Sequence, residues 1–200
     1  MLLDKKRIAV IEEFTKKYDK KLTGSEIAKE KNLNQKTVAN ILKELEKEHL
    51  LYRTTKGRNA EYHLHLDNKE SVQQFVTAVE HLRTLQFYKE KPHIKHIVKE
   101  VLEHCKGIVL IFGSYAKRSE KKTSDLDLFV AGRCDHEEIR KISEIYHLEI
   151  QIFEYRRKRF GKIIGTDILL HEIRNDHIIL RGAEDFVRAV MHGHAHQKML

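Results

Sequence analysis

An apolar run that ends in Gly-Ser, followed by two aspartates one residue apart, constrains this sequence more than any other feature. Residues 107–112, GIVLIF, are apolar and rich in β-branched side chains, which predicts a buried strand that ends at Gly113 and Ser114. Asp125 and Asp127 open the next apolar run. Because strand residues two apart project from one face, the two carboxylates are expected to point together, with the leucines beside them in the core.

Two carboxylates on one strand face need something to offset their repulsion. At a separation of about 6–7 Å they repel by about 2–3 kcal/mol at an effective dielectric near 20. Either a proton or a hard cation relieves this, and Mg²⁺ prefers oxygen ligands, including those of phosphate. Gly113 lets the backbone approach a ligand closely, and the amide and hydroxyl of Ser114 suit a triphosphate at the start of the next helix. The pattern predicts a metal and nucleotide site.

The run GSYAKRSEKKTSDLDL resembles the Gly-Ser, spacer, Asp-x-Asp signature of the DNA polymerase β-type nucleotidyltransferase superfamily, and its minimal members most of all. The resemblance covers residues 105–190 and implies a small mixed-sheet fold. It also implies that Asp125 and Asp127 hold two Mg²⁺ ions. These ions position a nucleoside triphosphate, expected to be ATP, for in-line attack on its α-phosphate.

Members of the superfamily also use a third carboxylate, on a later strand, to help activate the attacking hydroxyl. Here the candidate strand is residues 148–153, LEIQIF, in which Glu149 and Gln151 share a face. Glu149 is expected to complete the catalytic and metal-binding set, because it is the acid with apolar neighbours on both sides. Glu154, on the opposite face, is the weaker choice. If Gln151 takes the third position instead, the domain is expected to bind nucleotide without turning it over.

The first third of the chain predicts three helices followed by a hairpin. Residues 5–19 have helical apolar spacing, and Thr23 with Glu26 forms the pattern of a capping box at the start of a second helix. Asn34 is expected to cap a third helix. The buried stripe of that helix is predicted to be Val38, Ile41, Leu42 and Leu45.

The outer face of the third helix and the tip of the hairpin carry amide and basic side chains that suit DNA. Amides can pair with base edges, and cations can contact phosphates. The order of elements over residues 1–66 resembles the winged helix-turn-helix of small bacterial and archaeal transcription regulators, which implies double-stranded DNA as a partner. A scaffold or a dimer surface is the alternative use of such a domain. The predicted contacts are Gln35, Lys36, Thr37, Asn40 and Lys43 on the helix and Arg53, Lys56 and Arg58 on the wing.

Composition indicates which partners and which cellular compartment to expect. The formal net charge of +8 favours a polyanionic partner, and the excess leans towards the N-terminal third. The basic run at 155–159, YRRKR, fits the outer face of a short helix and receives no ligand. Cys105 and Cys134 are expected to form no disulfide framework. No apolar run approaches the length that spans a bilayer, so a cytoplasmic protein without membrane contact is expected.

The expected fold class is α+β, in three segments. Residues 1–68 form the helix-rich winged helix-turn-helix, and residues 69–104 form a helical connector that can also serve as a homodimer interface. Residues 105–200 form the nucleotidyltransferase-like domain with its mixed sheet.

Two functions remain open at this point. One is a DNA-binding protein with a Mg²⁺-dependent nucleotidyltransferase domain that transfers AMP to a partner protein, as an antitoxin does to a toxin. The other is a transcription regulator whose inactive nucleotidyltransferase-like domain serves as a nucleotide sensor or a dimerisation platform.

Overall fold

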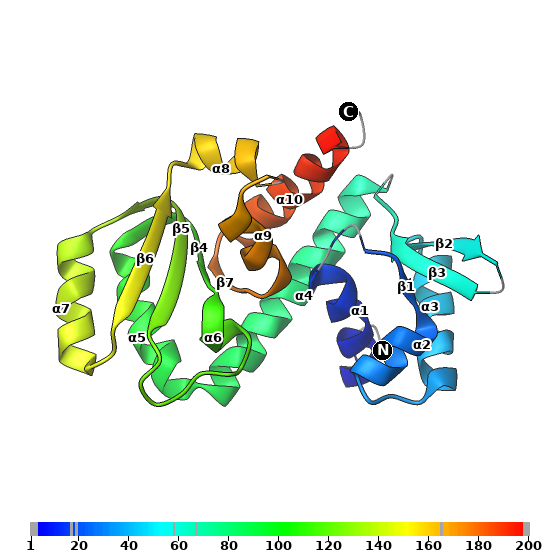
Figure 1. Cartoon of the computed structure of the whole chain (residues 1–200), viewed down its shortest axis with the longest axis horizontal. Helices are drawn as coiled ribbons and strands as arrows, with labels where there is room; N and C mark the ends of the chain where they lie inside the picture. The colour runs from blue at the N-terminus through cyan, green and yellow to red at the C-terminus, as the bar shows by residue number, and fades with distance from the viewer. Residues whose placement is uncertain are drawn as a thin grey trace. The chain divides into compact units, whose positions relative to one another are not determined.

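Two separate β-sheets organise the chain into two units, residues 1–79 and 80–200 (Figure 1). The boundary falls inside helix α4 (Lys69–Glu90). The computed structural model describes residues 4–16, 18, 20–57, 59–66, 68–164 and 166–197.

The first unit has the element order of a winged helix-turn-helix, as the sequence predicts. Its three strands form an antiparallel sheet in the order β1-β3-β2. Residues Leu51–Lys56 and Asn59–Leu64 form the wing hairpin. Besides the start of α4, the elements are α1 (Lys5–Lys16), β1 (Leu22–Thr23), α2 (Gly24–Glu30), α3 (Gln35–Lys47), β2 (Leu51–Lys56) and β3 (Asn59–Leu64).

Side-chain caps define where the helices of the helix-turn-helix begin. The Thr23 hydroxyl accepts from the Glu26 amide at 3.3 Å, and the Glu26 carboxylate accepts from the Thr23 amide at 2.7 Å. The backbone hydrogen bond from Thr23 lowers the pKa of Glu26. Asn34 Oδ1 accepts from the Lys36 amide at 2.9 Å. Both predicted caps are confirmed, and the predicted apolar stripe of α3 is buried.

The second unit is built on a mixed four-stranded sheet in the order β6-β5-β4-β7. Strand β5 pairs in parallel with β6 and antiparallel with β4, and β4 pairs antiparallel with β7. Besides the end of α4, the elements are α5 (Pro92–Glu103), β4 (Cys105–Ile111), α6 (Gly113–Ala116), β5 (Leu126–Cys134), α7 (His136–Tyr146), β6 (Ile150–Tyr155), α8 (Arg157–Ile163), α9 (Ile168–Asn175), β7 (Ile178–Arg181) and α10 (Ala183–Gln197). The predicted mixed sheet and α+β class are confirmed.

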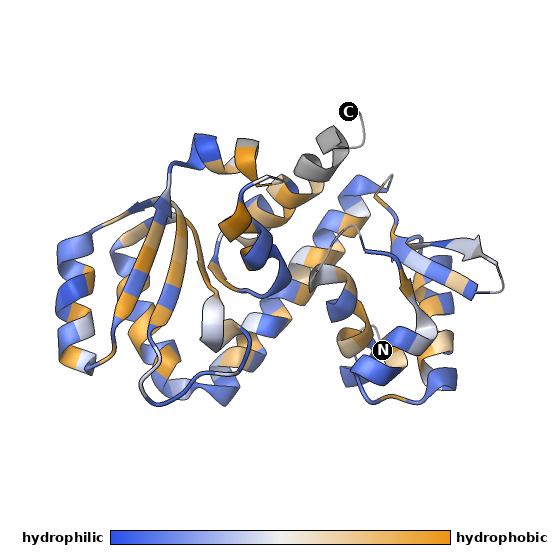
Figure 2. Ribbon diagram, viewed as in Figure 1, coloured by the Kyte–Doolittle hydropathy of each residue, from blue (hydrophilic) through white to orange (hydrophobic). Residues whose placement is uncertain are grey.

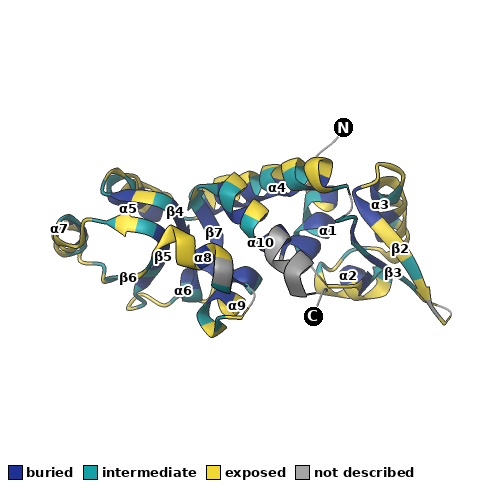
Figure 3. Ribbon diagram, turned by 90° about the horizontal axis from the view of Figure 1, so that it is seen from above, coloured by how far each residue is buried: buried dark blue, intermediate teal, exposed yellow. Residues whose placement is uncertain are grey.

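Helices cover both faces of this sheet. Leu126 and Leu128 of β5 pack on one face in a core that α5 and α7 complete. On the other face, Phe129 of β5 contacts Phe160 of α8, which stacks on Phe186 of α10. Figure 2 shows that β4 and β5 are hydrophobic along most of their length, and Figure 3 shows exposed residues at α8. The strands are therefore buried on both faces, as their apolar runs require.

The C-terminal half of α4 is joined to β7 by buried polar contacts. Arg83 forms an ion pair with Glu80 at 3.0 Å and donates to the His177 carbonyl, also at 3.0 Å. Thr84 donates to the Ile179 carbonyl at 2.7 Å. Residues 80–104 of the predicted connector thus lie within the second unit, while the homodimer role of that segment stays a prediction. Over the part of the chain that the structure describes, no helix has the length and apolar character needed to cross a bilayer.

The two cysteines differ from the sequence expectation, because they form a disulfide. Cys105 and Cys134 are opposite each other at one end of the β4–β5 ladder, with Cα atoms 4.3 Å apart. Antiparallel pairing brings together two residues that are 29 positions apart in the sequence. Spacing alone does not reveal this register.

The disulfide predicts a redox-dependent stability. Replacing both cysteines with serine should lower the free energy of unfolding by about 2–4 kcal/mol, because the unfolded chain regains the freedom of a closed loop. Chemical denaturation with and without dithiothreitol measures this. Reduction should reproduce the loss in the wild type and leave the double variant unchanged. Equal stability of the oxidised and reduced wild type would contradict the prediction.

Candidate nucleotide site and DNA-binding surface

Gly113 forms the turn that brings the end of β4 against β5. Its φ is +67°, a backbone conformation that side chains disfavour, and a Cβ there would overlap Oδ2 of Asp127. The amide of Phe112 donates to the Asp127 carbonyl at 3.1 Å, which holds the two strand ends together. Ser114 follows as the second residue of the short helix α6 and is half-buried. A side chain at this position would adopt a disfavoured backbone conformation and would have to displace the Asp127 carboxylate.

Asp125 immediately precedes β5, Asp127 is the second residue of that strand, and both are half-buried. The leucines at 126 and 128 point into the core, as the alternation predicts. Burial raises the pKa of Asp127, and the negative charge of Asp125 raises it further. This destabilised carboxylate pair is the arrangement that a bound cation relieves.

The third position of the site is filled by Gln151 rather than by Glu149. In the parallel β5–β6 ladder, Asp127 is opposite Gln151. The side-chain amide of Gln151 donates to Asp125 Oδ2 at 2.7 Å. Glu149 precedes β6, is exposed, and accepts from the Leu126 amide through its backbone carbonyl at 2.8 Å. Among the residues that the structure describes, no three His, Cys, Asp or Glu side chains are grouped so that they could hold a metal ion.

Phe153 is a further residue of this site that the sequence analysis did not single out. It is two positions beyond Gln151 on β6 and therefore shares its face. Its ring meets that of Phe112 edge-on with centroids 5.2 Å apart, and it remains 36% exposed. The alternation of side chains along β6 places Phe153 on the same face as Gln151, so the sequence contained the signal for this residue.

The spacer between Ser114 and Asp125 is held by ion pairs. Arg118 pairs with Glu90 at 2.8 Å, and Glu120 pairs with Lys91. These contacts attach the spacer to the end of α4 and the start of α5. The loop that leads to the aspartates is thus anchored at two points.

Most of the predicted DNA-contacting residues of α3 are exposed. Gln35, Lys36, Asn40 and Lys43 are exposed, and Thr37 is half-buried.

On the wing, Arg53 is exposed on β2 and pairs with Tyr62 in the β2–β3 ladder. Lys56 is the last residue of β2. The Lys56 side chain and Arg58 lie outside the described residues.

Arg7 forms ion pairs with two acids near the C-terminal end of α3. This almost buried guanidinium on α1 forms ion pairs with Glu44, at 3.3 Å, and Glu48. The positions of Lys36 and Lys43 lie on another side of the helix, and neither lysine has an ion pair among the described residues. The exposed lysines of α3 thus remain available for a phosphate contact, with Glu46 as the acid of the helix that Arg7 does not pair with.

A family model described as a nucleotidyltransferase domain matches residues 88–187. The chain belongs to this nucleotidyltransferase family. A second model, described as penicillinase repressor, matches residues 10–105, and the region has the winged helix-turn-helix fold described above.

One similar solved structure is MepR, a transcription regulator of the Staphylococcus aureus multidrug efflux pump MepA. It is 20% identical over 50% of this chain and 78% of that chain, with a TM-score of 0.35. The curated proteins contain no match. From the two family models, the chain combines a region similar to penicillinase repressor with a nucleotidyltransferase domain.

The side chains of this site are two carboxylates and one amide, not three carboxylates. Two carboxylates can hold one divalent cation. Asp125 and Asp127 offer oxygen ligands that Mg²⁺ prefers, and phosphate oxygens can complete its coordination. Gln151 contributes no negative charge and occupies one carboxylate oxygen of Asp125 with its amide. The site keeps the oxygen ligands for a cation and lacks the third acid beside them.

The raised pKa of Asp127 predicts that Asp127→Asn stabilises the protein without added cation. A raised pKa means that ionised Asp127 destabilises the folded state. This penalty is absent below the ordinary value of 3.8 and complete above the raised one. At about pH 7 the gain should be on the order of 1 kcal/mol after solvent screening. Thermal unfolding measures it, and the gain should shrink as the pH falls towards the ordinary value.

The matched control is Asp176→Asn, because Asp176 is also half-buried and ends helix α9 away from the pair. Its gain at neutral pH should be smaller than that of Asp127→Asn, because the helix end beside Asp176 carries only a partial negative charge. A loss of stability in Asp127→Asn at neutral pH would contradict the prediction.

Proposed function

We propose that this protein is a DNA-binding transcription regulator whose nucleotidyltransferase domain binds a nucleoside triphosphate with Mg²⁺ as a signal, without transferring its nucleotidyl group. The observation that carries this proposal is the hydrogen bond from the Gln151 amide to Asp125, at the position where the superfamily places its third carboxylate. An amide cannot accept a proton from an attacking hydroxyl at neutral pH. General-base help of this kind contributes about 10²–10⁴-fold to rates.

An amide in place of the third carboxylate also argues against a second cation. Two cations near one triphosphate need several anionic ligands, and Gln151 adds none. Asp125 and Asp127 would hold a single Mg²⁺, which supplies positive charge to the phosphate oxygens. Ser114 would contact a phosphate through its amide and hydroxyl, next to the turn at Gly113. The exposed ring of Phe153 offers a surface for the base, with ATP as the expected nucleotide.

The winged helix-turn-helix would bind double-stranded DNA through α3. Lys36 and Lys43 would contact phosphates, and Gln35 and Asn40 would contact base edges. Their exposure and the pairing of Glu44 and Glu48 with Arg7 support this. Regulators of this kind bind DNA as symmetric pairs, so we propose a homodimer.

Nucleotide binding and transfer are tested together with labelled ATP. Wild-type protein should bind ATP in the presence of Mg²⁺, and Asp125→Asn/Asp127→Asn should bind it at least 10-fold more weakly. No label should move from ATP to the protein, or to a partner protein in a lysate of the source cells. Glu149→Gln should bind as the wild type does, because Glu149 is exposed before β6 and the proposed cation ligands are Asp125 and Asp127 alone.

Two outcomes would overturn parts of this proposal. Transfer of label that Asp125→Asn/Asp127→Asn abolishes would establish an enzyme, such as an antitoxin that adenylylates its toxin. No ATP binding by the wild type, with or without Mg²⁺, would leave the domain as a dimerisation platform. The variant Gln151→Glu adds a third carboxylate to the site. Added Mg²⁺ should therefore raise its unfolding temperature more than it raises that of the wild type.

DNA binding is tested on the region upstream of the protein's own gene. Lys36→Ala/Lys43→Ala should weaken binding and reduce the slope of log affinity against log salt by about one for each lost phosphate contact. Lys89→Ala/Lys99→Ala is the matched control, because it removes two exposed lysines from α4 and α5. Equal effects of the two double variants would contradict the assignment of α3 to DNA.

A further inference from the structure

We propose that a basic pocket at the far end of the nucleotidyltransferase sheet binds a small polyphosphate anion. It lies where β4 begins and where β5 and β6 end, whereas the aspartates lie at the opposite end of the same strands. Gly132 is five residues beyond Asp127 on β5, which corresponds to about 17 Å at the rise of a strand. The pocket is thus a separate site, and its occupant does not depend on the proposed nucleotide function.

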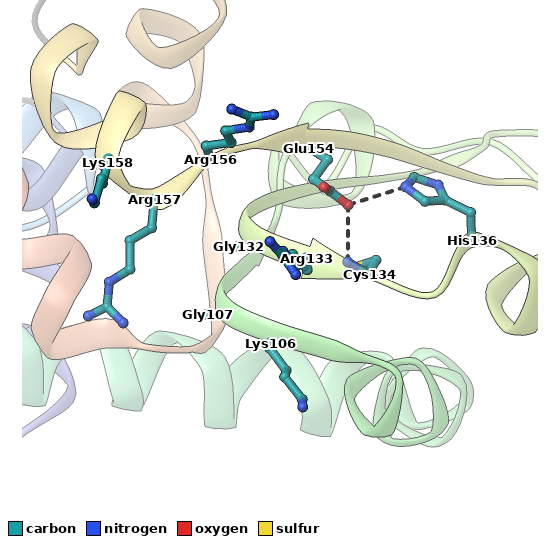
Figure 4. Close-up of a pocket in the computed structure, with 10 residues that line it drawn as sticks. All are labelled: Lys106, Gly107, Gly132, Arg133, Cys134, His136, Glu154, Arg156, Arg157 and Lys158. Carbon is teal, nitrogen blue, oxygen red and sulfur yellow. Dashed lines mark hydrogen bonds and ion pairs between the residues drawn. The ribbon is translucent and has the colours of Figure 1, made fainter.

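The lining brings together cations from distant parts of the sequence. Lys106 comes from β4, Arg133 from β5, and the run 156–158 from the junction of β6 and α8. This junction is part of the YRRKR run, to which the sequence alone assigned no ligand. Figure 4 shows Arg157 and Lys158 on one side of the bare backbone at Gly107 and Gly132, with the contact between Glu154 and His136 on the other.

Little negative charge within the protein offsets these cations. Glu154 is the acid of the lining, and its carboxylate already accepts from the Cys134 amide at 3.0 Å and contacts His136 at 3.2 Å. Arg157 pairs with Asp185 at 2.6 Å. Over the described part of the chain, the other four lysines and arginines of the lining have no ion pair: Lys106, Arg133, Arg156 and Lys158.

The pairing of β4 with β5 increases the repulsion among these positive charges. Lys106 is paired with Arg133 across the β4–β5 ladder, and like charges directly opposite each other destabilise a sheet. The neighbouring pair, Gly107 with Gly132, carries no side chains that could screen them. An anion bound beside the four unpaired cations would remove the repulsion.

The size and composition of the pocket favour a small ligand. Its volume is about 650 Å³, within the range of small-molecule sites. Arginine side chains bind phosphate oxygens in a fixed two-pronged geometry, and lysines act as point charges. Basic side chains that line one pocket suit several linked phosphates better than the extended backbone of a nucleic acid, which follows a long groove.

The test measures binding of inorganic tripolyphosphate to the full chain by calorimetry, with EDTA present. Arg133→Gln/Arg156→Gln should weaken binding at least 10-fold, because two unpaired guanidinium groups are lost. Asp125→Asn/Asp127→Asn should bind at least as well as the wild type, which separates this pocket from the nucleotide site. Both arginines are exposed, and circular dichroism should confirm that the double variant folds.

Two matched variants control for general attraction of anions. Lys36→Ala/Lys43→Ala and Lys89→Ala/Lys99→Ala each remove two exposed positive charges elsewhere and should change tripolyphosphate binding less than 2-fold. An effect as large as that of the pocket variant would overturn the proposal.

The last experiment measures binding of a single-stranded RNA and of a duplex DNA oligonucleotide. If either binds through Arg133 and Arg156 while tripolyphosphate does not bind, the pocket is a nucleic-acid contact and the proposal is wrong. The proposal also fails if the folded pocket variant binds tripolyphosphate as tightly as the wild type.

Discussion

The chemistry of the nucleotidyltransferase domain depends on the register in which β6 pairs with β5. That register is parallel and places Gln151 opposite Asp127, close enough for its amide to bind Asp125. A shift of two residues would bring Glu149 to the same place, because both side chains share one face of the strand. A two-residue shift in the pairing thus separates a site with three carboxylates from a site with two carboxylates and an amide.

The aspartate pair is held in place although it destabilises the folded chain. Gly113 touches Asp127 so closely that no side chain fits between them, and burial raises the pKa of Asp127. A fold that only needed stability would favour a neutral residue there. The carboxylate pair, beside the half-buried Ser114 and the exposed Phe153, is the physical basis on which we propose a cation and nucleotide site without a third acid.

Much of the fold could be predicted because its signals are local. The capping box at Thr23, the Asn34 cap and the apolar stripe of α3 each involve residues within one or two helical turns, and all are confirmed. The Cys105–Cys134 disulfide and the choice between Glu149 and Gln151 could not, because both depend on which strands pair and in what register. Apolar patterns identify the strands and leave that register open.

The sequence by itself determined the two kinds of domain, the Gly-Ser turn and the common face of Asp125 and Asp127, since strand alternation and helix periodicity are properties of a single segment. The tertiary structure decided what stands beside those groups. It put an amide next to the carboxylates, and it gathered Lys106, Arg133 and the basic run at 156–158 into one pocket. The physical reason is the same in both cases: neighbours across a sheet are set by strand pairing, which residues far apart in the chain establish together.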